Sequence, residues 1–588
     1  MNRKILQTAI AILFIATTAL QAKTIYVKSN GGNDSNTGDS WNTAYATLQK
    51  ALGVAVTGDE IWVAEGTYTS TAIGSAAFMI DKNIKLYGSF KGTEDFLSER
   101  VFGNEYTSIL NGGDKEMTVY TEDPIPNALI DGFKITGGKC GLFDNSNPSP
   151  TYSNLTISGI TTTSQGGGMK ISGSPILNNV TITGNTAESG GGIYISGGSP
   201  TLNNVTITGN TATKNGGGIW IHGNSVVAIN NSIISGNKAT VTGASETGRG
   251  GGIYLQYHST YEPLLTLTNS LISGNTAEDG GGIFNNHSSM ILTNVTIAGN
   301  HASEYAGGVC LYTWDTQNDF KNTIIWGNKD ENWISHPGVG YYDAGNKSTF
   351  NNCLVQEELS DLSGVQTGNI GLSTVGSASV FVNPVTPGLS TAGNYSLVAN
   401  SPAINKGNNS YNTTATDLAG NPRKNGTIDM GAYEFYNTYT VTFNSSGGSA
   451  VPAQEIIHGG KVIKPTDPTR GSDAFAGWFT ENTYSNTWDF NNHVVTGDMT
   501  LYAKWTSTSI LDAQASTVSI YPNPAQSTLY IQSAEAVEQV TIYDISGRAL
   551  MQVANPALSI DINSLATGIY LVKVKTAAGE TVKKIVKQ

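Results

Sequence analysis

The sequence contains little charge, few cysteines and no long apolar run beyond its first residues. Charged residues make up 13% of the 588 residues, and the net charge is −13. Nucleic-acid-binding proteins carry basic clusters, so an acidic chain without them argues against a nucleic-acid partner. Three cysteines, Cys140, Cys310 and Cys353, are too few for a disulfide framework and lack the spacing of a zinc site. We expect them to be small buried side chains.

The one strongly apolar stretch lies at the N-terminus and predicts an export signal. Arg3 and Lys4 precede the apolar run from Ile5 to Leu20, and Ala22 supplies a small residue for cleavage. This run is too short to indicate a membrane span. We therefore assign residues 1–22 to a signal peptide and expect no transmembrane segment in the mature chain.

The middle of the chain contains a repeat. Two similar copies are GGGMKISGSPILNNVTITGN, from Gly166, and GGGIYISGGSPTLNNVTITGN, from Gly190. A Gly-Asn pair ends each copy, with steps of 25, 27, 38, 25 and 28 residues between its asparagines: Asn185, Asn210, Asn237, Asn275, Asn300 and Asn328. Short β-branched segments alternate between glycines and asparagines, which is typical of strands and turns. The repeat therefore predicts a solenoid of short strands.

An asparagine also precedes one strand in each copy. Leu202 and Val205 are both expected to face inward although they lie three positions apart, which breaks the period of two in a strand. A bend at Asn203–Asn204 restores the period, because asparagine tolerates left-handed backbone conformations. We expect these asparagines to bond one another from coil to coil. The column consists of Asn154, Asn179, Asn204, Asn231, Asn269, Asn294, Asn322 and Asn352.

Apolar residues form a matching column that would hold the stack together. Its members are Ile182, Ile207, Ile234, Ile272, Ile297, Ile325 and Val355. Each fully buried side chain of this type contributes roughly 1.5–3 kcal/mol. Less regular copies upstream predict about twelve coils between residues 60 and 356. Ala44 to Ala55 is expected to form a short amphipathic helix that covers the open N-terminal edge.

Several segments resemble a known group of exported proteins. GDEIWVAEGTY (Gly58 to Tyr68), LYGSFKGTE (Leu86 to Glu94) and the GGGIYI…NNVTITGN copies are similar to the pectate-lyase-like and polymorphic outer-membrane-protein group. The resemblance implies an all-β fold, with a right-handed parallel β-helix, its N-terminal cap and its closing segment over residues 23–436. None of the group's catalytic signatures is matched, so the resemblance specifies the fold but not an activity.

The closing segment has its own signature. DLAGNPRKNGTIDMGAYE, from Asp417 to Glu434, resembles the last part of secreted β-helix proteins that carry C-terminal anchors. Arg423, Asp429 and Glu434 lie within it, and we expect them to close the fold as a structural ion-pair cluster rather than to act in catalysis.

Residues 437–506 resemble a single Listeria–Bacteroides repeat. This resemblance rests on VTFNSSGG at Val441, GWFTENTYSNTWDF at Gly477 and DMTLYAKW at Asp498, and it implies a small β-grasp-like module. So small a domain needs large core side chains, and we expect Trp478, Trp488 and Trp505 to supply them.

The C-terminus carries the most specific resemblance. After a linker at 507–517 come VSIYPNPAQSTLYI (Val518 to Ile531), VTIYDISGRAL (Val540 to Leu550) and LATGIYLVKV (Leu565 to Val574). Their order and spacing resemble the C-terminal sorting domain of the type IX secretion system, over residues 518–588. The resemblance implies a β-sandwich and the type IX machinery as a partner. It also implies transit through the periplasm, removal of this domain, and surface attachment or release.

Strand alternation predicts an outward row of aromatic side chains. If Ile193 and Ile195 face inward, Tyr194 faces outward. The aligned row is Lys170, Tyr194, Trp220, Tyr254, Phe284 and Cys310, and the next outward row is Ser196, His222, Gln256, Asn286 and Tyr312. Coils ~4.8 Å apart would stack the aromatics into a surface suited to sugar rings or to a protein groove. The alternative, that the rings stack for stability or lie beneath a loop, stays open. The predicted ligand-binding residues are Tyr194, Trp220, Tyr254, Phe284, His222 and Gln256.

Two insertions flank the strand that holds Tyr254. They fall at residues 238–249 and 256–263, and insertions in solenoids commonly gather on the functional side. His258 and Glu262 are the acid–base candidates that they bring near the aromatic row. Glycoside hydrolysis requires two converging carboxylates, and no such pair is evident in the sequence.

Acidic residues gather in one turn column, just before the glycine triplets. They are Glu188, Glu278, Asp279 and Glu304. Carboxylates in such a column could form an acidic edge or a calcium site, but solvated turn charges are the common case. We therefore expect no cofactor, with calcium at this edge as the one candidate.

These features favour a non-enzymatic surface protein that binds a polysaccharide or another cell-surface glycan, with the β-helix as its display surface. A secreted polysaccharide lyase or glycoside hydrolase is the alternative, and an architectural surface-layer component is a third. The expected location is the outer-membrane surface or the medium.

Overall fold

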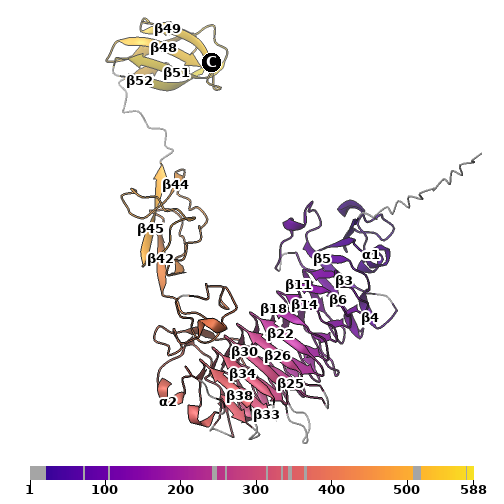
Figure 1. The fold of residues 1–588 in the computed structure, drawn as a ribbon. Coiled ribbons are helices and arrows are strands. Elements are labelled where there is room, and N and C mark those ends of the chain that lie inside the picture. Colours follow the sequence, from indigo (N-terminus) through magenta and orange to yellow (C-terminus); the bar gives the residue numbers. More distant parts are fainter. Residues whose placement is uncertain are drawn as a thin grey trace, which may run out of the picture. The chain divides into compact units, whose positions relative to one another are not determined.

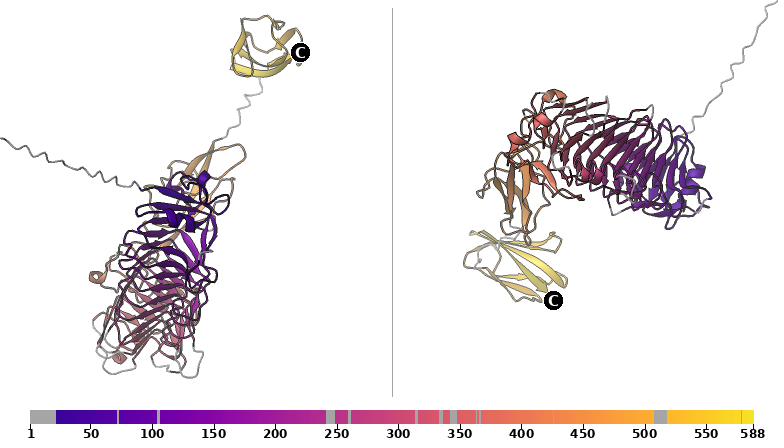
Figure 2. Two further views of the ribbon diagram at one scale, coloured as in Figure 1. Left: turned by 90° about the vertical axis from the view of Figure 1, so that its right-hand side faces the viewer. Right: turned by 90° about the horizontal axis from the view of Figure 1, so that it is seen from below.

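The computed structural model describes residues 22–588 except 71–72, 104–105, 241–247, 259–260, 313–315, 333–335, 342–346, 363, 365–366, 425, 507–517 and 578. The predicted signal peptide lies almost wholly outside the described residues, and the linker lies entirely outside them. The chain divides into two compact units, the first ending at Phe435 and the second beginning at Tyr436. The first unit is a right-handed parallel β-helix, whose strands stack coil upon coil (Figure 1; Figure 2).

One coil shows how the repeat folds. β17 (Ile193–Ile195), β18 (Thr201–Asn203), β19 (Thr206–Thr208) and β20 (Thr211–Ala212) follow one another around the coil, and each pairs in parallel with its equivalent in the next coil. They belong to four sheets, which we call C, A, B and D respectively. Sheet A runs from β1 (Thr24–Val27) to β38 (Lys347–Asn351), sheet B from β3 (Gly66–Thr69) to β39 (Leu354–Val355), sheet C from β4 (Ala76–Ile80) to β37 (Val339–Tyr341), and sheet D from β16 (Thr186–Ala187) to β36 (Lys329–Asp330).

The predicted asparagine bend joins sheets A and B. Asn204 and its equivalents, which we call the outer asparagine column, all have φ between 49° and 56°, in the left-handed region. The bend buries both Leu202 and Val205. Asn204 Nδ2 donates to Asn179 Oδ1 at 2.6 Å, and Asn179 Nδ2 donates to Asn154 Oδ1 at 3.2 Å. Asn269 donates in the same way to Asn231, and Asn322 to Asn294, so the predicted bonding is confirmed at these four steps of the column.

A second asparagine ladder lies inside the β-helix. It consists of the Gly-Asn residues Asn185, Asn210, Asn237, Asn275, Asn300 and Asn328, all of them buried. In each step the backbone N and the Nδ2 of one asparagine both donate to the Oδ1 of the next, at 2.9–3.0 Å. We call this the inner asparagine ladder. It satisfies buried polar groups that the turns would otherwise leave without partners.

The apolar column stands as predicted, and the N-terminal cap is shorter than predicted. Ile182, Ile207 and their equivalents are in register on sheet B and fully buried. The cap helix α1 covers Leu48–Val54, with Thr47 as its N-cap, and buries Leu48. The stack also begins earlier than residue 60, because β1 pairs with β2 (Glu60–Ala64) in sheet A. All three cysteines are buried and free, as expected.

The closing segment runs back across the last coils. Outer-column asparagines donate through Nδ2 to it: Asn352 to Lys406 O, Asn322 to Asn408 O, Asn294 to Asn412 Oδ1 and Asn269 to Thr416 O, at 3.0–3.2 Å. Below these contacts, apolar side chains on the outside of sheet B pack against Phe381, Tyr395, Leu397 and Met430. The segment therefore covers sheet B in the C-terminal coils.

The closing segment contains backbone hydrogen bonds to Arg423 as well as the predicted ion pair. Arg423 is fully buried, and its Nη2 donates to the carbonyl oxygens of Asp429 and Gly431. Its Nη1 lies 3.9 Å from Glu434 Oε2. Burial raises the pKa of Glu434 to about 8, so this carboxyl is largely protonated near neutral pH. Arg423 therefore donates to backbone carbonyls of the closing segment in addition to lying near Glu434, and its structural role stays a prediction.

Glu357 makes the stability of the β-helix end depend on pH. Its Oε1 accepts from the backbone N of Gly338 at 2.5 Å and of Val339 at 2.9 Å, and burial raises its pKa from 4.5 to about 7. Between these values the folded protein holds a proton that the unfolded chain releases. Stability should therefore fall as pH rises through this window, by roughly 3 kcal/mol.

Glu357→Gln should flatten that dependence, because a glutamine oxygen still accepts both hydrogen bonds. Urea midpoints measured below and above the window would show a smaller pH difference in Glu357→Gln than in the wild type. Glu358→Gln, a half-buried neighbour, serves as the control. An equal pH difference in wild type and Glu357→Gln would contradict the prediction.

The second unit contains two antiparallel-rich modules, each with its own core. In the first, β42 (Thr438–Asn444) lies between β43 (Gln454–Ile457) and β45 (Met499–Thr506), and β44 (Ala474–Phe479) completes the sheet. Trp478 is buried in its core, and Trp488 and Trp505 pack against it, as predicted. The second module has one sheet of β46 (Ser519–Tyr521), β47 (Thr528–Gln532) and β50 (Ser559–Asp561), and another of β48 (Val537–Tyr543), β49 (Ala549–Ala554), β51 (Gly568–Thr576) and β52 (Gly579–Lys587).

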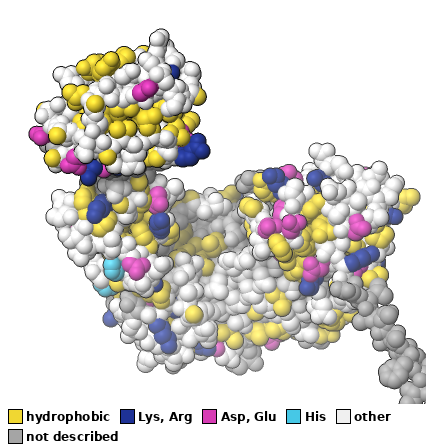
Figure 3. Space-filling view, turned by 90° about the horizontal axis from the view of Figure 1, so that it is seen from above, with side chains coloured by type: hydrophobic (Ala, Val, Ile, Leu, Met, Phe, Trp, Pro, Cys, Tyr) yellow, Lys and Arg dark blue, Asp and Glu magenta, His cyan; other side chains and the backbone are white. Residues whose placement is uncertain are grey.

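The face of the β-helix that Figure 3 shows carries mostly uncharged side chains in its middle, and charged side chains lie toward its ends. None of the helices in the described part of the chain is long and apolar enough to cross a bilayer.

Candidate functional site

The predicted outward row exists on sheet C. Tyr194 on β17 pairs in register with Lys170 on β13 (Met169–Ile171) and with Trp220 on β21 (Ile219–His222). The row continues through Tyr254, Phe284 and Cys310. Adjacent ring centroids lie 4.9 Å apart for Tyr194 and Trp220, 6.2 Å for Trp220 and Tyr254, and 5.7 Å for Tyr254 and Phe284. Strand alternation alone therefore placed these side chains on one face.

Only part of this row reaches the surface. Trp220 is half-buried, whereas Tyr194 is buried with 8% of its surface exposed, Tyr254 with 2% and Phe284 with 0%. Phe284 lies beneath Arg249, whose guanidinium carbon is 4.9 Å from the ring centroid, and it packs with Tyr305 and Ala306. The structure thus agrees with the alternative reading for Phe284, in which the ring lies beneath a loop instead of forming a binding surface. The same holds very nearly for Tyr254. Neither ring offers a face to a ligand in this conformation.

The second outward row is more accessible. Ser196, His222, Gln256, Asn286 and Tyr312 are all half-buried. The His222 ring lies 5.6 Å from Trp220 and 6.4 Å from Tyr194. Burial and the neighbouring His258 both lower the pKa of His222, so its ring is mostly neutral near pH 7 and can accept as well as donate a hydrogen bond. This row supplies the polar side of the candidate surface.

The row also extends further upstream than the sequence indicated. Tyr120 and Phe143 occupy the same outward register, with centroids 5.4 Å apart, and both are half-buried. The Lys170 ammonium lies 4.9 Å from the Phe143 ring and 5.8 Å from the Tyr194 ring. We call the residues Tyr120, Phe143, Lys170, Tyr194, Trp220 and His222 the ring strip. Its first two members were missed because their coils lack the glycine triplet, although Gly141-Leu142-Phe143 preserves part of the pattern.

His258 and Glu262 lie beside this surface, with different partners. The His258 ring is 5.2 Å from His222, and the backbone of His258 pairs with Tyr261. Glu262 Oε1 accepts from Ser289 Oγ at 2.6 Å. Both side chains are exposed. Their role as an acid–base pair stays a prediction.

The four acidic turn residues bond to protein groups. Glu188 pairs with Lys214 at 3.0 Å, Asp279 with Arg249 at 3.5 Å, Glu278 accepts from Gly248 N, and Glu304 accepts from Asn332 Nδ2. Calcium would need six to eight oxygen ligands. In the part of the chain that the structure describes, no three His, Cys, Asp or Glu side chains are grouped so as to hold a metal ion. The calcium hypothesis gains no support from this geometry.

The β-helix fold and the C-terminal sorting module together define an exported β-helix protein. Residues 519–588 match the family model of the secretion system C-terminal sorting domain, and residues 439–504 match that of the Listeria-Bacteroides repeat domain. Residues 121–291 match the right-handed β-helix region. The sorting domain addresses the chain through the type IX secretion system to the cell surface or the extracellular space.

Curated relatives share only a short stretch with this chain. A putative Gly-rich membrane protein of Evansella cellulosilytica is 44% identical over 69 residues, which is 12% of this chain and 8% of that protein. A putative membrane protein of the same organism is 41% identical over 69 residues, 12% of this chain and 10% of that protein. The matches thus span about a tenth of the length of these relatives.

Solved structures are similar in fold at low identity. A pectate lyase, Pel9A, is 16% identical, with a TM-score of 0.42, over 70% of this chain and 96% of that one. A rhamnogalacturonan lyase is 14% identical, with a TM-score of 0.31, over 64% and 97%. The tailspike protein gp49 of Acinetobacter baumannii bacteriophage Fri1, a capsular polysaccharide depolymerase, is 11% identical, with a TM-score of 0.35, over 96% and 78%. These values assign no substrate to this chain.

Proposed function

We propose that this protein is a non-enzymatic, surface-displayed or released glycan-binding protein that contacts its ligand through the ring strip. The observation that carries the proposal is the continuous series of rings from Tyr120 to His222, interrupted only by the Lys170 ammonium. Sugar rings stack their C–H faces on aromatic rings, while their hydroxyls need hydrogen-bonding neighbours. His222 and Gln256 supply such groups beside the rings.

The low charge of this face favours a sugar over a protein partner. The outward positions beside the strip hold uncharged polar side chains, Ser196, Gln256 and Asn286, and protein interfaces typically need a larger apolar centre. A strip one residue wide, repeated along coils ~4.8 Å apart, instead fits an extended chain of repeating units. The export address supports the same function, since it brings the strip to an environment rich in polysaccharides.

Replacing Tyr194 and Trp220 together by alanine should strongly weaken binding to the preferred glycan. Loss of two stacked rings corresponds to about 2–4 kcal/mol, or a thirtyfold to thousandfold weaker Kd. Binding of the full chain to a polysaccharide panel would be measured by calorimetry, with calcium present and absent. Ile176→Ala, which removes an exposed apolar side chain from sheet A, is the matched control.

Two outcomes would contradict the proposal. Unchanged binding in the Tyr194→Ala/Trp220→Ala variant would remove the ring strip as the contact surface. Depolymerisation of a panel glycan by the wild type, abolished in Glu262→Gln, would show an enzyme instead.

A further inference from the structure

The outer face of sheet B changes character along the β-helix. Where the closing segment covers the sheet, the outward residues are mostly apolar: Ile233, Leu271, Ile324 and Leu354 pack into that segment, and Thr296 between them accepts a hydrogen bond from Ala432 N. In the three coils directly upstream the same register holds Thr156, Thr181 and Thr206, each half-buried. The uncovered part of the face is therefore built of hydroxyl groups.

The outer asparagine column changes in parallel. In Asn269 and Asn322 the amide nitrogen both continues the column and donates to the closing segment, and in Asn294 and Asn352 it donates to the closing segment. Asn179 and Asn204 are exposed, and the side-chain amide of each donates one hydrogen bond to its neighbour in the column. A primary amide has two N–H donors. No described residue accepts a hydrogen bond from the second N–H of Asn179 or Asn204. These amide groups face solvent and can donate to an oxygen-rich ligand.

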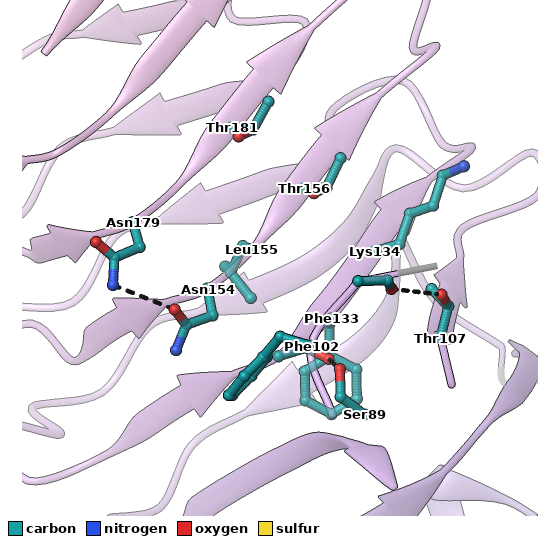
Figure 4. A pocket seen from close by; sticks show the side chains of 12 residues that line it. Ser89, Phe102, Thr107, Phe133, Lys134, Asn154, Leu155, Thr156, Asn179 and Thr181 are labelled. Atoms are coloured by element: carbon teal, nitrogen blue, oxygen red, sulfur yellow. Dashed lines mark hydrogen bonds between the residues drawn. The ribbon is translucent and has the colours of Figure 1, made fainter. Parts of the chain in front are cut away.

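A cavity of about 320 Å³ lies at the N-terminal end of this polar face. Figure 4 shows Asn154 and Asn179 on one side, Lys134 and Thr107 on the other, and Phe102 with Phe133 at one end. Its volume falls within the range of small-molecule sites. The walls are polar apart from the phenylalanines and Leu155.

Phe102 and Lys134 give the cavity a defined chemistry. Phe102 is 51% exposed, and the guanidinium of Arg100 lies 4.9 Å from its ring centroid while pairing with Asp131 at 2.7 Å. The Arg100–Asp131 pair is nearly buried, so it holds the ring from behind. Lys134 occupies the position next to Thr156 in the outward register. Within the described residues, its ammonium has no hydrogen-bond or ion-pair partner.

We propose that this cavity and the adjoining hydroxyl face form a second site, which binds an anionic sugar. The sugar ring stacks on Phe102, its carboxylate or sulfate pairs with Lys134, and its hydroxyls bond Thr156, Asn154 and Asn179. An anionic group would gain a charge-assisted hydrogen bond from the ammonium that a neutral sugar would not. The inference does not rest on the ring strip, which lies on sheet C and is proposed independently.

The test compares oligosaccharides of matched length that are carboxylated (oligogalacturonate), sulfated (heparin-derived) or neutral (cello-oligosaccharide), titrated into the full chain. We expect at least one anionic series to bind more tightly than the neutral series, and its affinity to fall with added salt. Lys134→Met should weaken that binding about tenfold and remove most of its salt dependence. The difference between the carboxylated and sulfated series identifies the anionic group.

Matched variants separate this site from its alternatives. Lys139→Met removes the same charge from an exposed lysine paired with Glu116, and it should leave binding unchanged. The proposal is overturned if no anionic series binds, if neutral and anionic series bind equally, or if Lys170→Met rather than Lys134→Met weakens binding.

Discussion

Deletion of residues 518–588 is expected to abolish surface display and leave the rest of the chain in the periplasm. The deleted part is the sorting domain, which has its own core of Leu529, Val540, Val572 and their neighbours. The β-helix has a separate continuous core, so the remaining chain should still fold. Cell fractionation and protease digestion of intact cells would show the product of the complete chain outside and the truncated chain inside. Display is lost because the export address is lost, not because the β-helix unfolds.

A matched deletion makes this result specific. Removing residues 437–506 also takes away a small β module with its own core, but it leaves the sorting domain in place. This variant should reach the surface normally. Circular dichroism of both purified variants would confirm that the β-helix is retained. Normal display of the chain that lacks 518–588 would refute the address.

Much of the fold could be predicted because a solenoid repeats its physical constraints. The left-handed bend at Asn204 follows from two inward residues three positions apart, and the structure has it in all eight copies. The sheet-B column from Ile182 to Val355 follows from the same step. The closing segment does not repeat, so its path over Asn269 to Asn352 could not be read from periodicity. It depends on contacts between residues more than 50 positions apart.

The candidate surface was predicted in position but not in exposure. Alternation gives the face of Tyr194, Tyr254 and Phe284, because side chains in a strand point to opposite sides. Burial of Phe284 depends on where Arg249 and Tyr305 return after their turns, which alternation does not specify. One sign was present in the sequence: Lys170 at one end of the row and Cys310 at the other mark a change from a solvated to a covered position.

Replacing Asn237 by alanine is expected to destabilise the β-helix by about 4 kcal/mol, since buried groups that lose a partner cost about 1–3 kcal/mol each. The Asn237 side chain makes four hydrogen bonds. Its Nδ2 donates to Ile207 O and Asn275 Oδ1 at 2.8 and 3.0 Å, and its Oδ1 accepts from N and Nδ2 of Asn210, both at 3.0 Å. Asn237 is fully buried, so water cannot replace it.

The outer asparagine column provides the control, because it uses the same residue on the surface. Asn204→Gly keeps the left-handed backbone at φ 54° and loses one exposed side-chain contact, to Asn179. It should cost well under half as much as Asn237→Ala in guanidinium unfolding. Asn237→Asp should also be strongly destabilising, since it buries a carboxylate and removes both amide donors. If Asn237→Ala cost no more than Asn204→Gly, the inner ladder would be a consequence of coil stacking rather than one of its causes.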